Sequence, residues 1–350
     1  MRHDTPHYNL IAAALAGKPW DPGPGWDWDK TVATAARERV LPALHAKLPC
    51  PPDIADFFEA IHELNGERNR QLLRETETLA LLLNQAGIEP VLLKGSAYLA
   101  SGVYANLADR HLSDIDVLVS PPDSARAFDI IRKSGYQPFI PNPTAFVRHH
   151  HPMLTQPHHV PVEVHHHLGL GACGALLSAA DIAADSTPSN LGRAVVRIPS
   201  AGHLMTHLIM HSQIHHGSYD RIWPSLRAMV DLVLLRRRFS VDWDAVRDRF
   251  RAQGKTAILN LHLMQIAKVL GAPPPFPISG GGLRWKYRQV LWREPRLRYL
   301  DPVYISSRVL LDKYWVSRGL LKHPLGVKFI IATPFRPSFY KRLFADIVQS

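Results

Sequence analysis

Two aspartates in the segment DIDVLV, residues 114–119, are the residues whose type and spacing point most directly to chemistry. If this segment is a strand, its side-chain period of two places Asp114 and Asp116 on one face and leaves Ile115 and Val117 to pack on a core. Two carboxylates side by side repel each other, and this repulsion costs free energy unless a cation lies between them. Oxygen ligands of this kind suit Mg²⁺ or Mn²⁺ better than zinc. The pair therefore predicts a divalent metal site.

A second candidate is the run formed by Lys94, Gly95 and Ser96, which follows a short apolar stretch. The pattern predicts a strand over residues 90–93 and a helix over residues 97–103, so the run lies at a strand-to-helix turn. The free N–H groups and dipole at a helix start bind phosphate, glycine allows close backbone approach, and the serine hydroxyl adds a donor. A phosphate-binding turn together with a carboxylate pair predicts metal-assisted phosphoryl or nucleotidyl transfer.

A third carboxylate, Glu163, lies in a strand that the alternating pattern predicts over residues 160–167. The same period places His165 and His167 on the face that carries Glu163. Several more histidines precede this strand, but they have no cysteine partner, and adjacent histidines of a strand point to opposite faces. We therefore favour a histidine-rich hairpin beside a phosphate site, with His165 nearest the chemistry, over a structural zinc site.

The order Gly-Ser, spacer, Asp-x-Asp resembles the signature of the polymerase-β-like nucleotidyltransferase superfamily. The longer string LLKGSAYL…YANLADRHLSDIDVLV resembles, more narrowly, a bacterial branch of uncharacterised nucleotidyltransferases. That branch pairs Lys-Gly with Arg-x-x-x-Asp-x-Asp, which Lys94 and Arg110 match here. It also shows an acidic residue followed by x-His further along, which Glu163 and His165 match.

The resemblance implies an α+β fold with a polymerase-β-like core, a small mixed sheet flanked by helices. It implies that Asp114, Asp116 and Glu163 hold two Mg²⁺ (or Mn²⁺) ions, with Glu163 completing the metal site or deprotonating the acceptor hydroxyl. The substrate would be an NTP, by default ATP, whose α-phosphorus is attacked with release of pyrophosphate. The residues expected to contact the nucleotide or its phosphates are Lys94, Gly95, Ser96, Arg110 and His165.

Composition along the chain predicts five parts. They are an N-terminal helical segment (1–87), the nucleotidyltransferase core (88–168), a helical second domain (169–271), a Pro/Gly linker (272–282) and a basic, aromatic-rich segment (283–350). In the second part we expect a helix at 122–134 and strands at 136–140 and 145–154, besides the elements above.

The helical parts are predicted from apolar periodicity. We expect one long helix over 54–86 ahead of the core, and helices at 201–216, 225–237, 243–253 and 256–270, the first capped by Ser200. In the first of these, four histidines recur every four residues and form one stripe. Packing at a domain contact and contact with a base or acceptor are both open for this stripe, His203, His207, His211 and His215.

The formal net charge is +11, and residues 283–350 supply most of it. This segment is open to three interpretations, as an RNA-binding surface, an anionic membrane surface or a solvated basic face. No apolar run approaches the roughly 20 residues of a membrane span. Two cysteines give neither a disulfide framework nor a zinc pattern, so we expect a cytoplasmic protein.

The acceptor hydroxyl is not evident from these residues; RNA, a protein and a small molecule all remain open. Two alternatives to a general transferase also stay open. One is a catalytically silent nucleotide- or RNA-binding module of the same fold, and the other is a toxin-type transferase acting on tRNA.

Overall fold

The computed structural model describes residues 5–139, 149–169, 172–215 and 225–278 of the chain. Among the described residues, those within 5–139 and 152–278 belong to the first of two compact units. The basic segment predicted at 283–350 and part of the predicted linker lie outside the described residues. The prediction that this segment binds an anionic partner therefore stays a prediction. The following account concerns the first unit.

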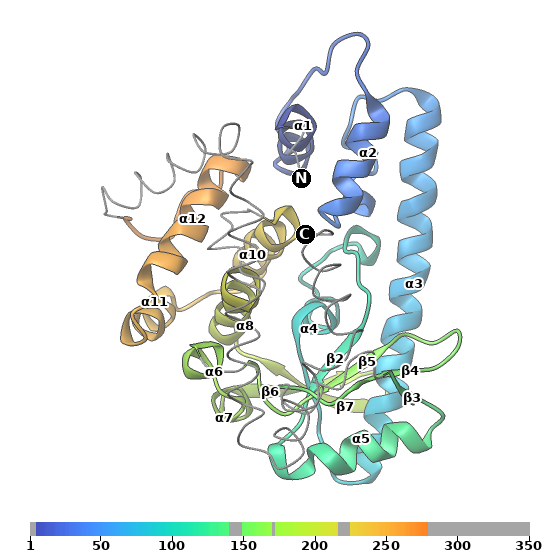
Figure 1. Cartoon of the computed structure of the whole chain (residues 1–350), viewed down its shortest axis with the longest axis vertical. Helices are drawn as coiled ribbons and strands as arrows, with labels where there is room; N and C mark the ends of the chain where they lie inside the picture. The colour runs from blue at the N-terminus through green and yellow to red at the C-terminus, as the bar shows by residue number, and fades with distance from the viewer. Residues whose placement is uncertain (1–4, 140–148, 170–171, 216–224, 279–350) are drawn as a thin grey trace, which may run out of the picture. The chain divides into compact units, whose positions relative to one another are not determined.

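Helices begin the chain, as the sequence predicts (Figure 1). Helix α2 starts after Asp27, whose carboxylate accepts the Lys30 N–H, and the long helix α3 starts with a proline and ends just before Gly87 at φ 72°. Both ends follow common capping rules. The N-terminal elements are α1 (Thr5–Leu15), α2 (Trp28–Arg37), the 3-10 turn η1 (Leu41–Leu44) and α3 (Pro52–Gln85).

A seven-stranded mixed sheet follows, with strand order β3-β4-β5-β2-β1-β7-β6. The central strand β2 pairs antiparallel with β1 and parallel with β5. This architecture confirms the predicted α+β class with a mixed sheet and flanking helices. The strands are β1 (Val91–Leu92), β2 (Ile115–Leu118), β3 (Gln137–Phe139), β4 (Met153–Thr155), β5 (Val162–His165), β6 (Ser186–Leu191) and β7 (Ala194–Pro199).

Short helices connect these strands. The helix predicted at the turn after β1 begins earlier than expected, at Lys94, and the helix predicted at 122–134 is confirmed, with a 3-10 turn as its first part. Part of the predicted strand 145–154 lies outside the described residues. The connecting elements are α4 (Lys94–Ala100), η2 (Leu107–Asp109), η3 (Pro121–Asp123) and α5 (Ser124–Lys133).

Sequence patterning missed the hairpin of β6 and β7, which extends the sheet beyond β1. Strand β6 forms the edge of the sheet, is rich in polar side chains and contains Pro188. An edge strand is half solvated and tolerates proline, so it shows no clear hydrophobic period. The sheet therefore continues into residues that we expected to form only the helical second domain.

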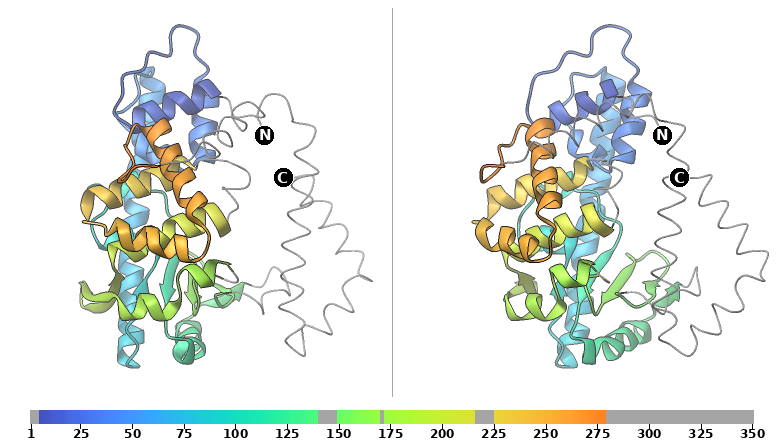
Figure 2. Two further views of the ribbon diagram at one scale, coloured as in Figure 1. Left: turned by 90° about the vertical axis from the view of Figure 1, so that its left-hand side faces the viewer. Right: turned by 60° about the vertical axis from the view of Figure 1, so that its left-hand side comes forward.

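Beyond the hairpin the chain is helical, and Figure 2 shows these helices gathered beside the sheet. The four helices predicted in this part are confirmed, and the Ser200 hydroxyl accepts the His203 N–H as the expected cap. No helix in the described ranges is long and apolar enough to cross a membrane. The elements are α6 (Ala172–Leu176), α7 (Ala179–Ala184), α8 (Ala201–Ile209), the π-helix η5 (Met210–His215), α10 (Leu226–Arg238), α11 (Trp243–Ala252) and α12 (Thr256–Leu270).

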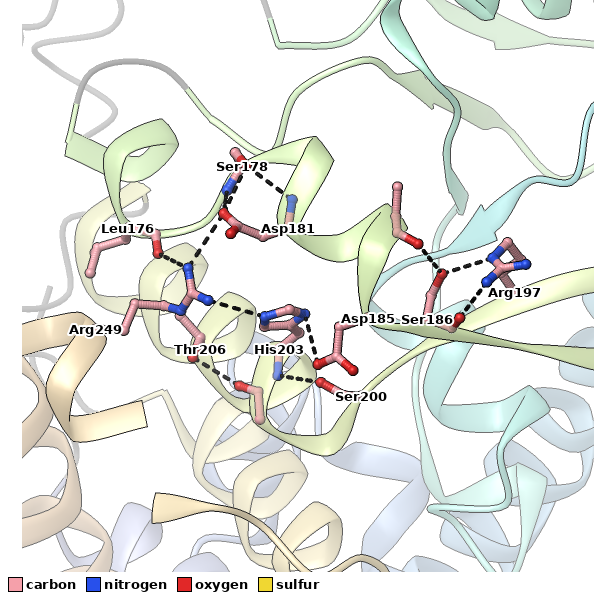
Figure 3. Close-up of polar contacts among 12 residues, drawn as sticks. Leu176, Ser178, Asp181, Asp185, Ser186, Arg197, Ser200, His203, Thr206 and Arg249 are labelled. Atoms are coloured by element: carbon pink, nitrogen blue, oxygen red, sulfur yellow. Dashed lines mark hydrogen bonds and ion pairs between the residues drawn. The ribbon is translucent and has the colours of Figure 1, made fainter. Parts of the chain in front are cut away.

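One arginine on α11 joins three neighbouring helices (Figure 3). The Arg249 guanidinium donates to the Leu176 carbonyl at 3.2 Å, and it lies 3.4 Å from an Asp181 carboxylate oxygen and 3.2 Å from His203 Nε2. Asp181 is itself fixed by a reciprocal capping box with Ser178 at the start of α7. These contacts fix α11 against the ends of α6, α7 and α8.

Helix α3 fixes several loops of the sheet through polar side chains. The Asn84 side chain bonds the Val195 N–H at 2.8 Å and the Val195 carbonyl at 3.0 Å, which fixes β7 to the helix. Glu75 accepts the Val160 N–H at 2.7 Å, just before β5. Since each bond satisfies a backbone group near a strand end, α3 fixes the starts of β5 and β7.

We predict that acid destabilises the protein partly through His262 on α12. This side chain is fully buried, with Nδ1 3.0 Å from Gln213 Nε2, and burial lowers its pKa from 6.5 to about 4. Between these values the unfolded chain binds a proton that the folded chain does not, so the free energy of unfolding falls as the pH falls. His262 should account for a loss of about 2 kcal/mol from pH 7 to pH 5.

Urea unfolding at the two pH values measures this loss. The variant His262→Gln should lose about 2 kcal/mol less than the wild-type protein over the same interval. The exposed His167→Gln serves as the control and should leave the pH dependence unchanged. Equal pH dependence in His262→Gln and wild type would contradict the assignment.

Candidate active site

Two acidic residues lie side by side at the centre of the sheet. Strands β2 and β5 are parallel, and their register pairs Asp116 with Glu163. Directly paired residues on neighbouring strands point to the same face. Asp116 is almost completely buried, whereas Glu163 is partly exposed. The sheet therefore brings together two carboxylates that are far apart in the sequence.

Lys94 supplies the nearest positive charge. Its Nζ lies 2.6 Å from Asp116 Oδ1 and 3.7 Å from Glu163 Oε2. Burial alone would lower the pKa of Lys94, but the charges of Asp116 and Glu163 outweigh burial and raise the pKa. The lysine is therefore charged at neutral pH and partly balances both carboxylates.

The backbone of Lys94 is left-handed, with φ at 47°. A residue with a Cβ in this region stores of order 1 kcal/mol of strain or more, and such residues cluster at functional sites. The preceding Leu93 N–H donates to the Asp116 carbonyl at 3.0 Å, which fixes this turn beside β2. The strained turn is what directs the lysine to the carboxylates.

His165 contacts both carboxylates from β5. Its Nε2 lies 2.9 Å from Asp116 Oδ1 and 3.4 Å from Glu163 Oε2. Carboxylates only accept hydrogen bonds, so Nε2 carries the proton. Burial opposes the charged ring, but the hydrogen bonds to Asp116 and Glu163 raise the pKa of His165.

The same two contacts act on Asp116 in the opposite direction. Burial works against its ionised form, yet the Lys94 charge and the bond to His165 hold the pKa of Asp116 well below its usual range. Both contacts go to Oδ1. Among the described residues none bonds Oδ2, so this oxygen is available to a further cation.

Asp114 is held less tightly than Asp116. It lies just before β2, is partly exposed, and accepts a bond from the Ser113 hydroxyl at 2.9 Å. Burial first, and then the Asp116 charge, raise the pKa of Asp114. The two aspartates therefore repel each other, as the sequence analysis expects of a pair on one face.

Three of these side chains form a group that could hold a metal ion: Asp116, Glu163 and His165. One ligand atom from each lies within 4.8 Å of the other two, and within the described ranges no second group of this kind occurs. Two carboxylates in register are hard oxygen ligands. The donor set therefore fits a divalent ion, although Asp114 lies outside this closest group.

Gly95 and Ser96 are both buried in the structure. A Cβ on Gly95 would lie 1.9 Å from Leu112 Cδ2 and 2.5 Å from Arg110 Nη1, so glycine is required here by close packing. The Ser96 hydroxyl accepts the Asp116 N–H at 3.4 Å. These contacts explain both residues without a ligand, and their predicted contact with phosphate stays a prediction.

Arg110 is also buried, and its partner is on another element. The guanidinium donates to both carboxylate oxygens of Asp231 on α10, each at 2.8 Å, and lies 5.2 Å from the centre of the Tyr98 ring. Tyr104 donates to the same carboxylate at 2.6 Å. Arg110 therefore joins the segment before β2 to the helical part, which the sequence analysis did not foresee.

The segment before β2 is fixed from the other side by α3. The Asn65 amide donates to the Ala108 and Arg110 carbonyls, and the Asn69 amide donates to the Leu107 and Arg110 carbonyls, at 2.6–3.0 Å. Three backbone carbonyls, those of Leu107, Ala108 and Arg110, are satisfied in this way. The chain segment that leads to Asp114 and Asp116 is thus fixed by hydrogen bonds to both α3 and α10.

The histidine stripe of α8 and η5 reaches the site at one end. His207 is buried, and burial first, followed by the charges of Lys94 and His165, lowers its pKa to about 3. Its ring lies 6.1 Å from that of His211, which stacks on His215 at 5.2 Å. The four-residue spacing of the histidines predicted the stripe. The position of the stripe near Lys94 could not be predicted, because it depends on the packing of α8 near α4.

A mixed sheet that carries paired carboxylates, with a cationic turn beside them, is the arrangement expected of a nucleotidyltransferase. The chain belongs to the family of uncharacterised nucleotidyltransferases, whose model matches residues 24–271. This match confirms the family that the sequence resembles. It spans the sheet and the helices through α12. A comparison with curated proteins returns no match.

We predict that Gly95→Ala destabilises the protein through the close approach of Leu112 and Arg110. Overpacking of this kind costs about 1–3 kcal/mol, and the added methyl has only buried neighbours to displace. The free energy of unfolding in urea measures the effect. Gly202→Ala on α8 is the matched control, because its Cβ would meet Val246 Cγ2 at an ordinary 3.9 Å.

The control should be neutral or stabilised by up to about 1 kcal/mol, since alanine favours helix more than glycine does. A Gly95→Ala protein as stable as the control would show that the packing explanation of this glycine is wrong.

Proposed function

We propose that this protein transfers a nucleoside monophosphate from an NTP to an acceptor hydroxyl and releases pyrophosphate. The observation that carries the proposal is the register of β2 and β5, which pairs Asp116 with Glu163 beside the Lys94 ammonium. The family match supports transfer chemistry in general. The acceptor is proposed only as an RNA, protein or small-molecule hydroxyl.

The residues that would hold Mg²⁺ or Mn²⁺ are Asp114, Asp116 and Glu163. Divalent ions bound there would lower the pKa of the acceptor hydroxyl and stabilise the charge on the entering and leaving oxygens. The fit rests on oxygen ligands, on the unbonded Oδ2 of Asp116 and on the mutual repulsion of the two aspartates.

The other residues act on position and charge. His165 fixes the orientation of Asp116 and Glu163, because its Nε2 contacts both. We propose that Lys94 attracts the β- and γ-phosphates, whose charge grows as the bond from the α-phosphorus to the β-phosphate oxygen breaks. The acceptor oxygen forms the new bond to the α-phosphorus, and its proton leaves to solvent or to Glu163.

Arg110 was predicted to contact phosphate, and we propose a different role for it. Its guanidinium is engaged by Asp231 in a bidentate pair, which uses the donors that would otherwise face a phosphate. We therefore propose that Arg110 positions the segment leading to Asp114. Gly95 and Ser96 would support the same turn through their packing.

The test is transfer of label from each α-³²P NTP, with Mg²⁺ or Mn²⁺, to total RNA, proteins or small molecules of a cell extract. Asp116→Asn and Glu163→Gln keep the shape of the side chain but lose its charge, so each should lower transfer at least about 100-fold. The control is Glu89→Gln, a half-exposed carboxylate paired with Arg197, which should retain transfer. Full activity in Asp116→Asn would sink the proposal.

Nuclease or protease sensitivity of the labelled product then identifies the acceptor class. Label on tRNA alone would favour the toxin-type alternative. If wild-type protein binds NTP in calorimetry but transfers no label to any fraction, the silent binding module becomes the better account.

A further inference from the structure

A group of arginines lies near the segment that leads to Asp114, and these arginines outnumber the acidic side chains around them among the described residues. Arg227 is on the first turn of α10, is partly buried, and among the described residues its guanidinium has no hydrogen bond or ion pair. Burial first, and then the charges of Arg110 and Arg39, lower the pKa of Arg227 to about 10. A buried cation without a partner costs free energy that a bound anion would recover.

Contacts of neighbouring residues bring the other members to the same place. The Leu226 N–H donates to Glu38 at 3.0 Å, which places Arg39 beside the start of α10. Arg68 on α3 donates to the Ser113 carbonyl at 3.4 Å, and Arg110 donates to the His111 carbonyl at 3.2 Å. The start of α10, α3 and the segment before β2 therefore meet here.

The pKa of His111 reflects the positive charge of the surrounding arginines. Burial and then the charges of Arg227, Arg68, Arg39 and Arg110 lower its pKa to about 4, so the imidazole is neutral at pH 7. Asp231 lies one helical turn after Arg227 but is already bonded to Arg110 and Tyr104. Glu38 adds a second carboxylate at the start of α10, so among the described residues four arginines, Arg39, Arg68, Arg110 and Arg227, share Asp231 and Glu38 and keep an excess of positive charge.

We propose that Arg39, Arg68, His111 and Arg227 form a phosphate-binding subsite next to the metal-binding carboxylates. Guanidinium groups match phosphate oxygens in a two-pronged geometry, and a neutral imidazole adds a donor. Two residues separate His111 from Asp114, so a phosphate held here lies beside the proposed reaction centre. The phosphate belongs either to the NTP or to a phosphorylated acceptor, and this use of the subsite rests on the proposed function.

The experiment measures phosphate binding without metal, so that it does not depend on catalysis. Inorganic tripolyphosphate is titrated into the full chain in EDTA by calorimetry. Arg227→Gln should weaken binding at least about 10-fold, the loss of one charge-assisted contact. Arg237→Gln is the control, because it removes the same charge from an exposed position near the other end of α10.

A second probe separates the two sources of phosphate. A 5′-phosphorylated RNA oligonucleotide is compared with its 5′-hydroxyl twin. If Arg227→Gln weakens the binding of tripolyphosphate, the subsite serves the NTP. If Arg227→Gln abolishes only the tighter binding of the 5′-phosphorylated RNA over the 5′-hydroxyl RNA, the subsite serves an acceptor. The exposed Arg68→Gln should show the same pattern more weakly and remains informative if Arg227→Gln fails to fold.

Binding of both probes by Arg227→Gln and Arg68→Gln as tightly as by Arg237→Gln would overturn the subsite. The result is independent of the catalytic proposal. Asp116→Asn should keep metal-free tripolyphosphate binding while it loses transfer. A wild-type protein that binds tripolyphosphate through Arg227 but transfers nothing would instead overturn the catalytic proposal alone.

Discussion

The buried charge of Asp116 is the constraint on which the site depends. An ionised carboxylate inside a protein is stable only when cations and hydrogen bonds replace the water that it loses. Here Lys94 and His165 both contact one oxygen of that carboxylate. The left-handed turn at Lys94 positions the first partner, and the parallel pairing of β5 with β2 positions the second. Removal of either partner would leave a buried negative charge poorly balanced.

The surrounding elements keep that arrangement in place through backbone groups far from the chemistry. Helix α3 satisfies the carbonyls of Leu107, Ala108 and Arg110 through Asn65 and Asn69, and α10 holds Arg110 through Asp231. The chain between these anchors leads directly into β2. The helical part is therefore more than a cover for the sheet, because one of its carboxylates fixes the segment that carries the aspartates.

The sequence predicted what is local and missed what is distant. The side-chain period of a strand predicted that Asp114 shares a face with Asp116 and that Glu163 shares a face with His165. This could be predicted because the face of a residue depends only on its neighbours in the same strand. The pairing of Asp116 with Glu163 came from a family resemblance, since strand register is not visible in either segment alone. The pair of Arg110 with Asp231 was missed because Asp231 lies in a remote helix, and the predicted contact of Arg110 with phosphate stays a prediction. Strand β6 was missed because a polar edge strand has no apolar period.

Asp114 and Asp116 differ in what balances their charges, and this difference bears on how a metal would bind. Asp116 already has two partners at Oδ1, Lys94 and His165, whereas Asp114 has the Ser113 hydroxyl and a pKa raised by burial and by Asp116. An added cation would relieve the repulsion between the two aspartates if it bound Asp114 together with Oδ2 of Asp116, an oxygen that no described residue bonds. Because Lys94 bonds Oδ1, it could stay bound to Asp116 while a metal ion used Oδ2. The ammonium and the metal would then act together on the phosphates rather than compete for one carboxylate oxygen.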